Sequence, residues 1–298
     1  MIPAALATWL LRTRETIDGD RLNVPDNRGT LIFRDYGADV LLVAHVDHVG
    51  EPVASPIRVS GTRVAHVGLD DRLGCYAIEE LVRRGVKADL LFTDCEETGQ
   101  TTGADFVAPR EYRFILSMDR AGVDCVLYQY DDHKAWRKFC GRHIGPHALG
   151  SVSCIDSMAH LSCCGINVGV GYFEHNGPRC WADVRLTMAQ LARTESFIVR
   201  ARRKRWEYAP VVYADGNSRA DWTTARWDAP RCQFDDGNRF GMVNARDPFD
   251  RDYGEGWERF DERDQAEIDE RAACPSELDA DGLRRLINWT LRRQKGRV

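Results

Sequence analysis

Short apolar runs recur along the first two thirds of the chain, and charged or imidazole side chains follow each of them. Apolar runs of this length without alternation are typical of strands that are buried on both faces of a sheet. We expect such strands at residues 40–44, 88–93, 113–118 and 165–172. A helical repeat of apolar residues lies between the first two runs, at residues 73–85. This alternation predicts an α/β fold built on an open sheet.

The polar side chains that follow the four runs are all of types that ligate metals. They are His45, the adjacent pair Glu96 and Glu97, Asp119, and His175. Open α/β sheets bind their ligands at the carboxyl ends of the strands, so we expect these side chains to gather at one edge of the sheet. Taken singly, each is equally consistent with a polar loop that follows a strand.

Two further carboxylates, Asp70 and Asp71, stand at the start of the predicted helix. Aspartate is a favoured helix cap, and its charge complements the helix dipole. Capping needs only one of the two side chains. The other can therefore point toward the strand ends.

The predicted cluster has more ligands than one tetrahedral zinc ion needs. Two histidines and three carboxylates suit two metal ions, with one Asp shared and an open position on each ion. Ions about 3.5–4 Å apart can hold a water molecule, lower its pKa toward about 7 and polarise a carbonyl group. One carboxylate of the Glu pair is then left to deprotonate the water and to protonate a leaving amine. Together these groups could catalyse the hydrolysis of an amide.

Five motifs, taken together and in order, resemble the co-catalytic zinc exopeptidases of the MH clan. They are AHVDHV, GLDDRLG, DCEETG, SMDRAG and GYFEH, and the resemblance runs over residues 9–183. It implies a three-layer α/β/α sandwich with a central mixed, mostly parallel sheet. It also implies two Zn²⁺ ions, or Co²⁺ or Mn²⁺ in their place.

The resemblance assigns a role to each matched residue. His45 and Asp119 would bind one metal, Glu97 and His175 would bind the other, and Asp70 would bridge the two. Glu96 would be the general base, and Asp47 would orient His45.

The spacing of the motifs favours a layout closest to the M28 aminopeptidases over the related M20 and M42 families. His175 follows Asp119 after only 56 positions, which leaves no room for the lid domain of most M20 members. His45 and Asp70 are too close for the M42 insertion. The chain departs from its relatives after His175, where residues 176–179 include no acidic residue.

Composition narrows the class of protein and the compartment. The net charge of −5 argues against a generic nucleic-acid partner, and no apolar run is long enough to span a membrane. No Lys or Arg precedes the apolar residues near the N-terminus, so we expect no secretory signal. The ten cysteines are scattered without a CxxC pair, which indicates reduced thiols and a cytoplasmic location.

The C-terminal third has a different character. We divide the chain into a catalytic domain, residues 1–205, and an irregular charged extension, residues 206–298, that ends in an amphipathic helix at 281–294. Before the extension we expect a helix at 187–203, begun by a capping box of Thr187 and Gln190. The family resemblance does not cover the extension.

Several other polar residues are weaker candidates for the site. We expect the remaining histidines to be satisfied or at the surface; they are His48, His66, His133, His143, His147 and His160. Arg120 could hold a substrate carboxylate or pair with a surface acid. Cys154 has no evident general base in the sequence, so it is not a candidate nucleophile.

The sequence thus predicts a dinuclear zinc-dependent exopeptidase, an aminopeptidase acting on peptides through a metal-bridged water. A second hypothesis keeps the fold and metals but changes the bond, giving a deacylase or amidohydrolase that acts on N-acyl amino acids. A third, an inactive binding protein of the same fold, is disfavoured because all five ligands and the base are present. No nucleic-acid or membrane partner is expected.

Overall fold

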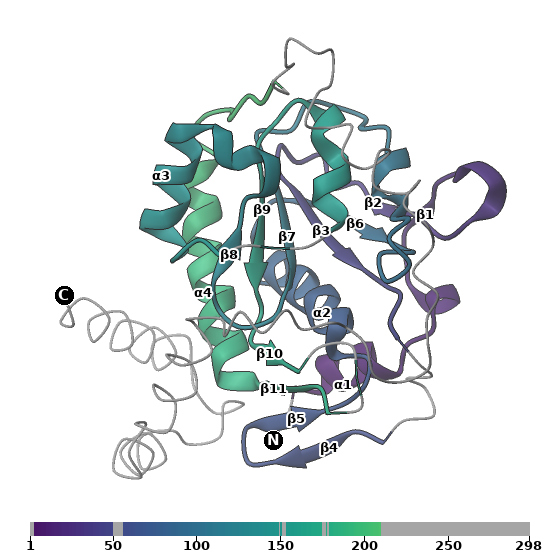
Figure 1. Cartoon of the computed structure of the whole chain (residues 1–298). Coiled ribbons are helices and arrows are strands. Elements are labelled where there is room, and N and C mark those ends of the chain that lie inside the picture. The colour runs from purple at the N-terminus through teal and green to yellow at the C-terminus, as the bar shows by residue number, and fades with distance from the viewer. Residues whose placement is uncertain are drawn as a thin grey trace, which may run out of the picture. The chain divides into compact units, whose positions relative to one another are not determined.

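A seven-stranded mixed sheet lies at the centre of the structure (Figure 1). In sheet order its strands are β1 (Asp20–Arg21), β2 (Ile32–Arg34), β6 (Asp89–Thr93), β3 (Leu41–His45), β7 (Ile115–Arg120), β9 (Gly165–Gly169) and β8 (Cys125–Val126). Strands β6, β3, β7 and β9 are mutually parallel, whereas β2 and β8 run antiparallel to their neighbours. The sheet is therefore mixed and mostly parallel, as predicted.

This computed structural model describes most of the first two thirds of the chain. The described residues are 3–49, 56–148, 150, 153–174, 177 and 179–209. His175 and the predicted extension beyond residue 209 lie outside them.

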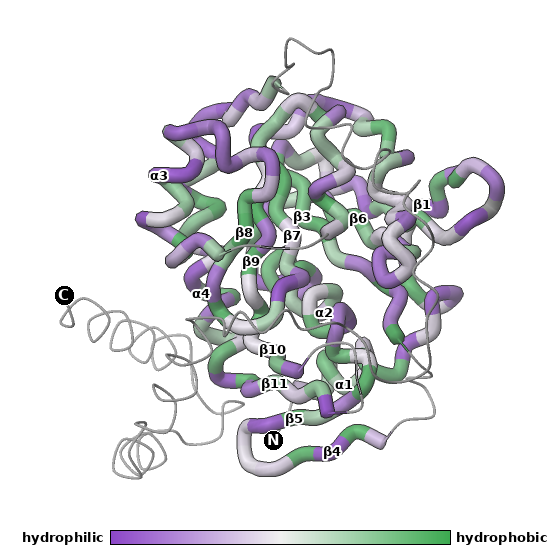
Figure 2. Tube along the Cα trace, in the orientation of Figure 1, coloured by the Kyte–Doolittle hydropathy of each residue, from purple (hydrophilic) through white to green (hydrophobic). Residues whose placement is uncertain are grey.

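The central strands form where the apolar runs predicted them. Every residue of β3 and β6 is buried, and Figure 2 shows hydrophobic residues gathered on the central strands. The parallel register sets His45 beside Thr93 and Val43 beside Ser117. Because the carboxyl ends of β3, β6 and β7 are thus level, the polar residues that follow them meet at one edge of the sheet.

Helices cover both faces of the sheet. The α-helices are α1 (Ala4–Leu11), α2 (Leu69–Arg83), α3 (Lys134–His143) and α4 (Val184–Ala201). The 3₁₀ helices are η1 (Arg14–Thr16), η2 (Pro25–Asn27), η4 (Thr102–Asp105), η5 (Tyr128–Asp132) and η6 (Cys154–Leu161). Helix α2 packs on β3 and β7 and contacts α1 and α4, whereas η4 packs on η6, which contacts β3, β7 and β9.

The connections explain the layers. Strands β6 and β7 flank β3 on opposite sides, so the right-handed crossovers that lead to them pass over opposite faces. Helix α2 belongs to the first crossover and η4 to the second. The result is the expected three-layer arrangement.

A second, smaller sheet differs from the prediction. Its antiparallel strands, in order, are β10 (Tyr172–Phe173), β11 (Trp181–Asp183), β5 (Arg63–Ala65) and β4 (Arg58–Ser60). The predicted strand 165–172 was too long: β9 ends at Gly169, and Tyr172 belongs to the second sheet. Gly171 makes the change of direction, with a φ of +90° that L-residues rarely adopt.

Helix α4 begins three residues earlier than predicted, at Val184. Its cap is Asp183, whose side chain accepts a hydrogen bond from the N–H of Arg185 (2.9 Å). The predicted capping box is wrong, because the Thr187 hydroxyl donates to the Asp183 carbonyl and the Gln190 amide donates to the Gly169 carbonyl.

The core continues just past the predicted domain boundary. Trp206 is 5% exposed, and its ring lies 4.9 Å from that of Trp136. Tyr208 packs edge-on against Tyr130 at 4.8 Å. The predicted extension beyond residue 209, with its amphipathic helix, lies outside the described residues. Among the helices that are described, none has the length and apolarity to cross a membrane.

Candidate metal centre

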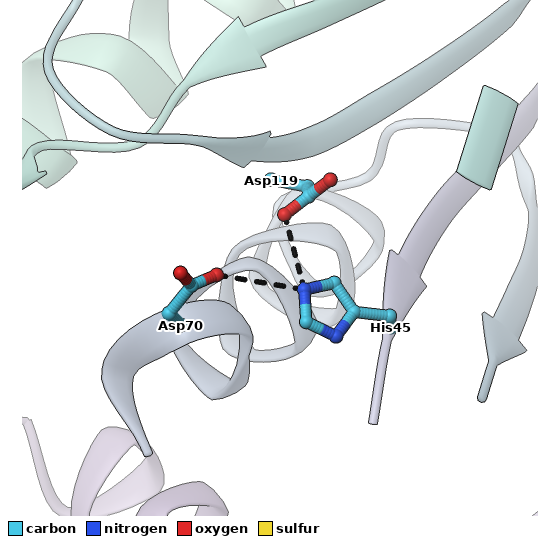
Figure 3. Close-up of side chains that lie close together, drawn as sticks. All are labelled: His45, Asp70 and Asp119. Carbon is cyan, nitrogen blue, oxygen red and sulfur yellow. Dashed lines mark ion pairs between the residues drawn. The ribbon is translucent and has the colours of Figure 1, made fainter. Parts of the chain in front are cut away.

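His45 is the last residue of β3, and one nitrogen of its ring faces two carboxylates (Figure 3). Its Nε2 atom is 3.2 Å from Oδ1 of Asp119 and 3.5 Å from Oδ1 of Asp70. Asp119 comes from β7, the neighbouring parallel strand, and Asp70 comes from the start of α2. All three side chains are buried. The structure thus brings together three of the five predicted ligands, from three separate elements.

The two aspartates of α2 divide the two tasks that the sequence suggested. Both have non-helical backbone angles, so the regular helix starts after Asp71. Oδ1 of Asp71 accepts a hydrogen bond from the N–H of Gly74 (2.8 Å), as a helix cap does. Asp70, joined to Asp71 by a cis peptide bond, points instead toward His45. One aspartate caps the helix, and the other joins the cluster.

Asp47 orients His45 from the side opposite the cluster. Nδ1 of His45 lies 3.0 Å from the Asp47 carbonyl oxygen and 3.3 Å from its carboxylate. Both partners are acceptors, so Nδ1 carries a proton, and Nε2 is the ring nitrogen turned toward Asp119 and Asp70. The other Asp47 oxygen accepts from the N–H of Glu97 (3.0 Å). Burial alone would raise the pKa of Asp47, but the contacts with His45 and this loop lower it to about 2.

Glu96 and Glu97 complete the cluster in the loop after β6. Oε2 of Glu96 is 3.9 Å from Nε2 of His45, and one ligand atom from each of His45, Glu96 and Glu97 lies within 4.8 Å of the others. Burial and the neighbouring carboxylates raise the pKa of Glu96 to about 9 and that of Glu97 to about 7. The pKa of Asp119 is raised for the same reasons. The larger cause is burial, which disfavours the charged form, and repulsion between the carboxylates adds to it.

The donor set fits a small divalent cation. Nε2 of His45 and Oε1 of Glu97 are buried, and neither has a hydrogen-bond partner among the described residues. Two ligand atoms bound to one tetrahedral zinc ion at about 2.0–2.1 Å are roughly 3.3 Å apart. The separations of 3.2 and 3.5 Å around His45 match that spacing. A cation there would also offset the repulsion between the carboxylates.

Three residues that sequence reasoning missed hold the aspartates in place. Ser153 and Asn167 donate to Oδ2 of Asp119 at 3.1 and 3.4 Å. The Tyr172 hydroxyl lies 2.9 Å from Oδ1 of Asp70, to which it donates. Ser and Asn are too common to attract notice, although Tyr172 does fall within the GYFEH motif.

The remaining candidates fall mostly as expected. Four histidines bond to main-chain atoms: His66, His133, His147 and His160. His143 packs on the ring of Phe139 at 4.6 Å. His48 is the exception, because its Nδ1 is buried without a partner among the described residues.

Arg120 and Cys154 are not free for catalysis. The guanidinium of Arg120 forms a two-point ion pair with Asp124, whose second contact is 3.1 Å, so the alternative of an acid partner is confirmed. Burial raises the pKa of the Cys154 thiol to about 12, and Ser117 lies 3.5 Å from its sulfur. A thiol held protonated in this way is a poor nucleophile.

Comparisons with known proteins add little to this geometry. No protein-family model matches the chain, and no curated protein sequence matches it. Among solved structures, aminopeptidase PepT from Bacillus cereus aligns with a TM-score of 0.47 at 10% identity, over 58% of this chain and 84% of that one. The TET aminopeptidase from a marine sediment archaeon of the Thaumarchaeota aligns with a TM-score of 0.45 at 12% identity, over 66% and 95%. Likenesses this distant do not support an argument about function. That argument rests on the cluster itself.

Proposed function

We propose that this chain is a metal-dependent hydrolase that cleaves amide bonds, and that it acts as an aminopeptidase with two zinc ions. The observation that carries the proposal is the buried Nε2 of His45, which has no hydrogen-bond partner among the described residues and lies 3.2 and 3.5 Å from carboxylates of separate elements. Glu96, at 3.9 Å, adds a carboxylate to the same place. An imidazole held by Asp47 and surrounded by acids is the arrangement that metal ligands need.

The proposed division of labour follows the motifs. His45 and Asp119 would hold one ion, Glu97 and His175 the other, and Asp70 would serve both. When bound, the ions would polarise the substrate carbonyl and make a water molecule more acidic. Asp47 keeps the His45 ring in the orientation that turns Nε2 inward. Once bound cations offset the charge of the neighbouring carboxylates, Glu96 would be ionised; it would then accept the proton of the attacking water and later pass it to the leaving nitrogen.

Membership of the MH clan belongs to this proposal, as does the place nearest the M28 aminopeptidases. The support is the order of the five motifs and the short segments between them. The substrate would be a peptide with a free amino end.

The same cluster would also serve a deacylase. Nothing in the acid and imidazole set distinguishes a peptide bond from the amide of an N-acyl amino acid. This second function therefore stays beside the first until substrates are compared.

The test combines metal analysis with a choice of substrates. The full chain is freed of metal, reloaded with Zn²⁺, Co²⁺ or Mn²⁺, and assayed on amino-acid anilides, N-acyl amino acids and a mixed peptide library read by mass spectrometry. We expect close to two ions per chain and loss of single residues from the amino ends of peptides. Cleavage of only N-acyl amino acids would favour the deacylase. Absence of bound metal would overturn the proposal in both forms.

A further inference from the structure

The two aspartates beside His45 are held by a connected set of polar side chains, which we call the cradle: Ser153, Asn167 and Tyr172. All three are at most 2% exposed. They come from three different places, namely the segment before η6, strand β9 and strand β10. Their contacts give each aspartate a defined orientation.

The cradle uses up one oxygen of Asp119. Its Oδ2 atom accepts from the Ser153 hydroxyl (3.1 Å) and from the Asn167 amide (3.4 Å). The same Asn167 accepts from the N–H of Asp119 with its own oxygen (3.2 Å) and donates to Ser153 (3.1 Å). Because Ser153 receives a hydrogen bond from Asn167, its own proton is directed at Asp119. Oδ1 of Asp119 is the oxygen left to face His45.

Tyr172 holds Asp70 differently, because it contacts the same oxygen that faces His45. Its hydroxyl donates to Oδ1 of Asp70 (2.9 Å), and the Asp119 carbonyl oxygen is a second acceptor at 3.1 Å. The tyrosine thus ties the two aspartates to one another.

We propose that Ser153, Asn167 and Tyr172 are positioning residues that preset Asp70 and Asp119 for a small divalent cation, with Asp119 offering it one oxygen only. The inference rests on the metal site of the proposed function. It also names the class of cation. Ca²⁺ takes six to eight oxygen ligands and often binds carboxylates through both oxygens, whereas zinc-like ions need fewer. Two-oxygen binding by Asp119 would break the bonds from Ser153 and Asn167.

The test measures cation affinity of the full chain without reference to activity. Co²⁺ is titrated into metal-free protein and followed by its visible absorption, with Zn²⁺ measured by competition. Ser153→Ala and Tyr172→Phe each remove one hydroxyl of the cradle. Their matched controls are Ser157→Ala, whose hydroxyl bonds to the Cys154 carbonyl, and Tyr130→Phe, whose hydroxyl bonds to the Ile155 carbonyl.

We expect the two cradle variants to bind Co²⁺ and Zn²⁺ about 10–100-fold more weakly, the usual cost of losing a partner of a metal ligand. The two controls should bind as the wild type does. Urea unfolding of the metal-free proteins separates lost affinity from lost folding, and Tyr172→Phe keeps the test valid if Ser153→Ala does not fold. Ca²⁺ in excess should leave the Co²⁺ titration of the wild type unchanged.

Two results would overturn the inference while leaving the proposed function intact. One is wild-type affinity in both cradle variants. The other is effective competition by Ca²⁺, which would remove the cation preference. A wild-type chain that binds no divalent cation would instead defeat the proposed function, and this inference with it.

Discussion

At the scale of single residues, Glu96 offers the sharpest separation of chemistry from metal binding. Glu96→Gln keeps the shape of the side chain but removes the charge that would accept a proton. Because Glu96 is not among the five proposed ligands, we expect metal content to stay unchanged while turnover falls by roughly 10²–10⁴-fold. Elemental analysis and a peptidase assay on the same sample measure both.

Glu97→Gln is the matched control. Because Glu97 is a proposed ligand, the same change at this neighbouring residue should lower metal content. Normal turnover by Glu96→Gln would show that the base has been misassigned. A loss of metal in that variant would instead make Glu96 a ligand.

The residues of the cluster could be predicted because they are chemically distinctive and stand at strand ends. An apolar run that stops at His45 or Asp119 is visible in any reading of the sequence. The residue pattern alone does not decide between Asp70 and Asp71, because both fit a cap and the choice depends on backbone angles. Only the family resemblance assigns the bridging role to Asp70. Ser153 and Asn167 could not be predicted, since their role exists only through contacts across 34 and 48 positions of the chain.

At the scale of elements, the close approach of α2 to β7 depends on Gly74. A Cβ atom there would lie 1.8 Å from the main-chain oxygen of Met118, the residue before Asp119. We expect Gly74→Ala to force α2 and β7 apart, which should cost about 1–3 kcal/mol or more of unfolding free energy and weaken metal binding. Urea unfolding and a Co²⁺ titration measure the two effects.

The control for Gly74 is Gly141→Ala in α3. Its nearest neighbour would be the end of a side chain, the His147 ring at 2.9 Å, which can move. We expect little change there, as alanine is also the better helix former. Equal effects at the two glycines would contradict the argument from backbone contact.

The end of α2 carries a pH-dependent contact that is remote from the cluster. Both oxygens of Glu80 are bonded, to Arg83 at 2.6 and 2.8 Å and to Arg84 at 2.9 Å. Burial alone would raise the pKa of Glu80, but these partners lower it below its ordinary value. A carboxyl with a lowered pKa stabilises the fold above its unfolded pKa, and the gain is lost as the pH falls through its folded pKa.

Glu80→Gln should therefore cost about 1 kcal/mol at pH 7, a modest value because Arg83 is largely exposed. The difference between variant and wild type should shrink as the pH falls below about 4. Urea unfolding at a series of pH values measures it. A difference that is constant down to pH 3 would show that packing, and not charge, is responsible.

Elements were predicted well where periodicity is strong and poorly where a turn decides. The apolar runs predict β3, β6 and β7, and the helical repeat predicts most of α2. The crossing from β9 to β10 depends on one positive φ at Gly171, and the start of α4 depends on Asp183 as the cap in place of Thr187. A positive φ and the identity of a cap residue are local features of the backbone, and the pattern of apolar residues does not predict them.

At the scale of the whole molecule, the layered fold followed from the alternation of strands and helices, but its limits did not. The composition changes at Trp206, which suggested a boundary there. In the structure the N–H of Cys164 donates to the carbonyl of Trp206, so this residue completes the edge of the core. The charge-rich sequence that follows Trp206 gives no sign that its ring is buried.

The whole fold should also depend on the cation. Gathering the carboxylates of Asp47, Asp70, Glu96, Glu97 and Asp119 around one imidazole costs free energy. A bound cation recovers part of that cost, because it binds the folded cluster and not the unfolded chain. At a free concentration of 100 times the dissociation constant, such a ligand adds about 2.7 kcal/mol to the free energy of unfolding. We expect Zn²⁺ to raise the thermal midpoint of the full chain and a chelator to lower it again. His45→Ala should reduce this increment, because His45 belongs to both groups of ligand atoms, one with Asp70 and Asp119 and one with Glu96 and Glu97. An undiminished increment in His45→Ala would place the stabilising ion elsewhere in the chain.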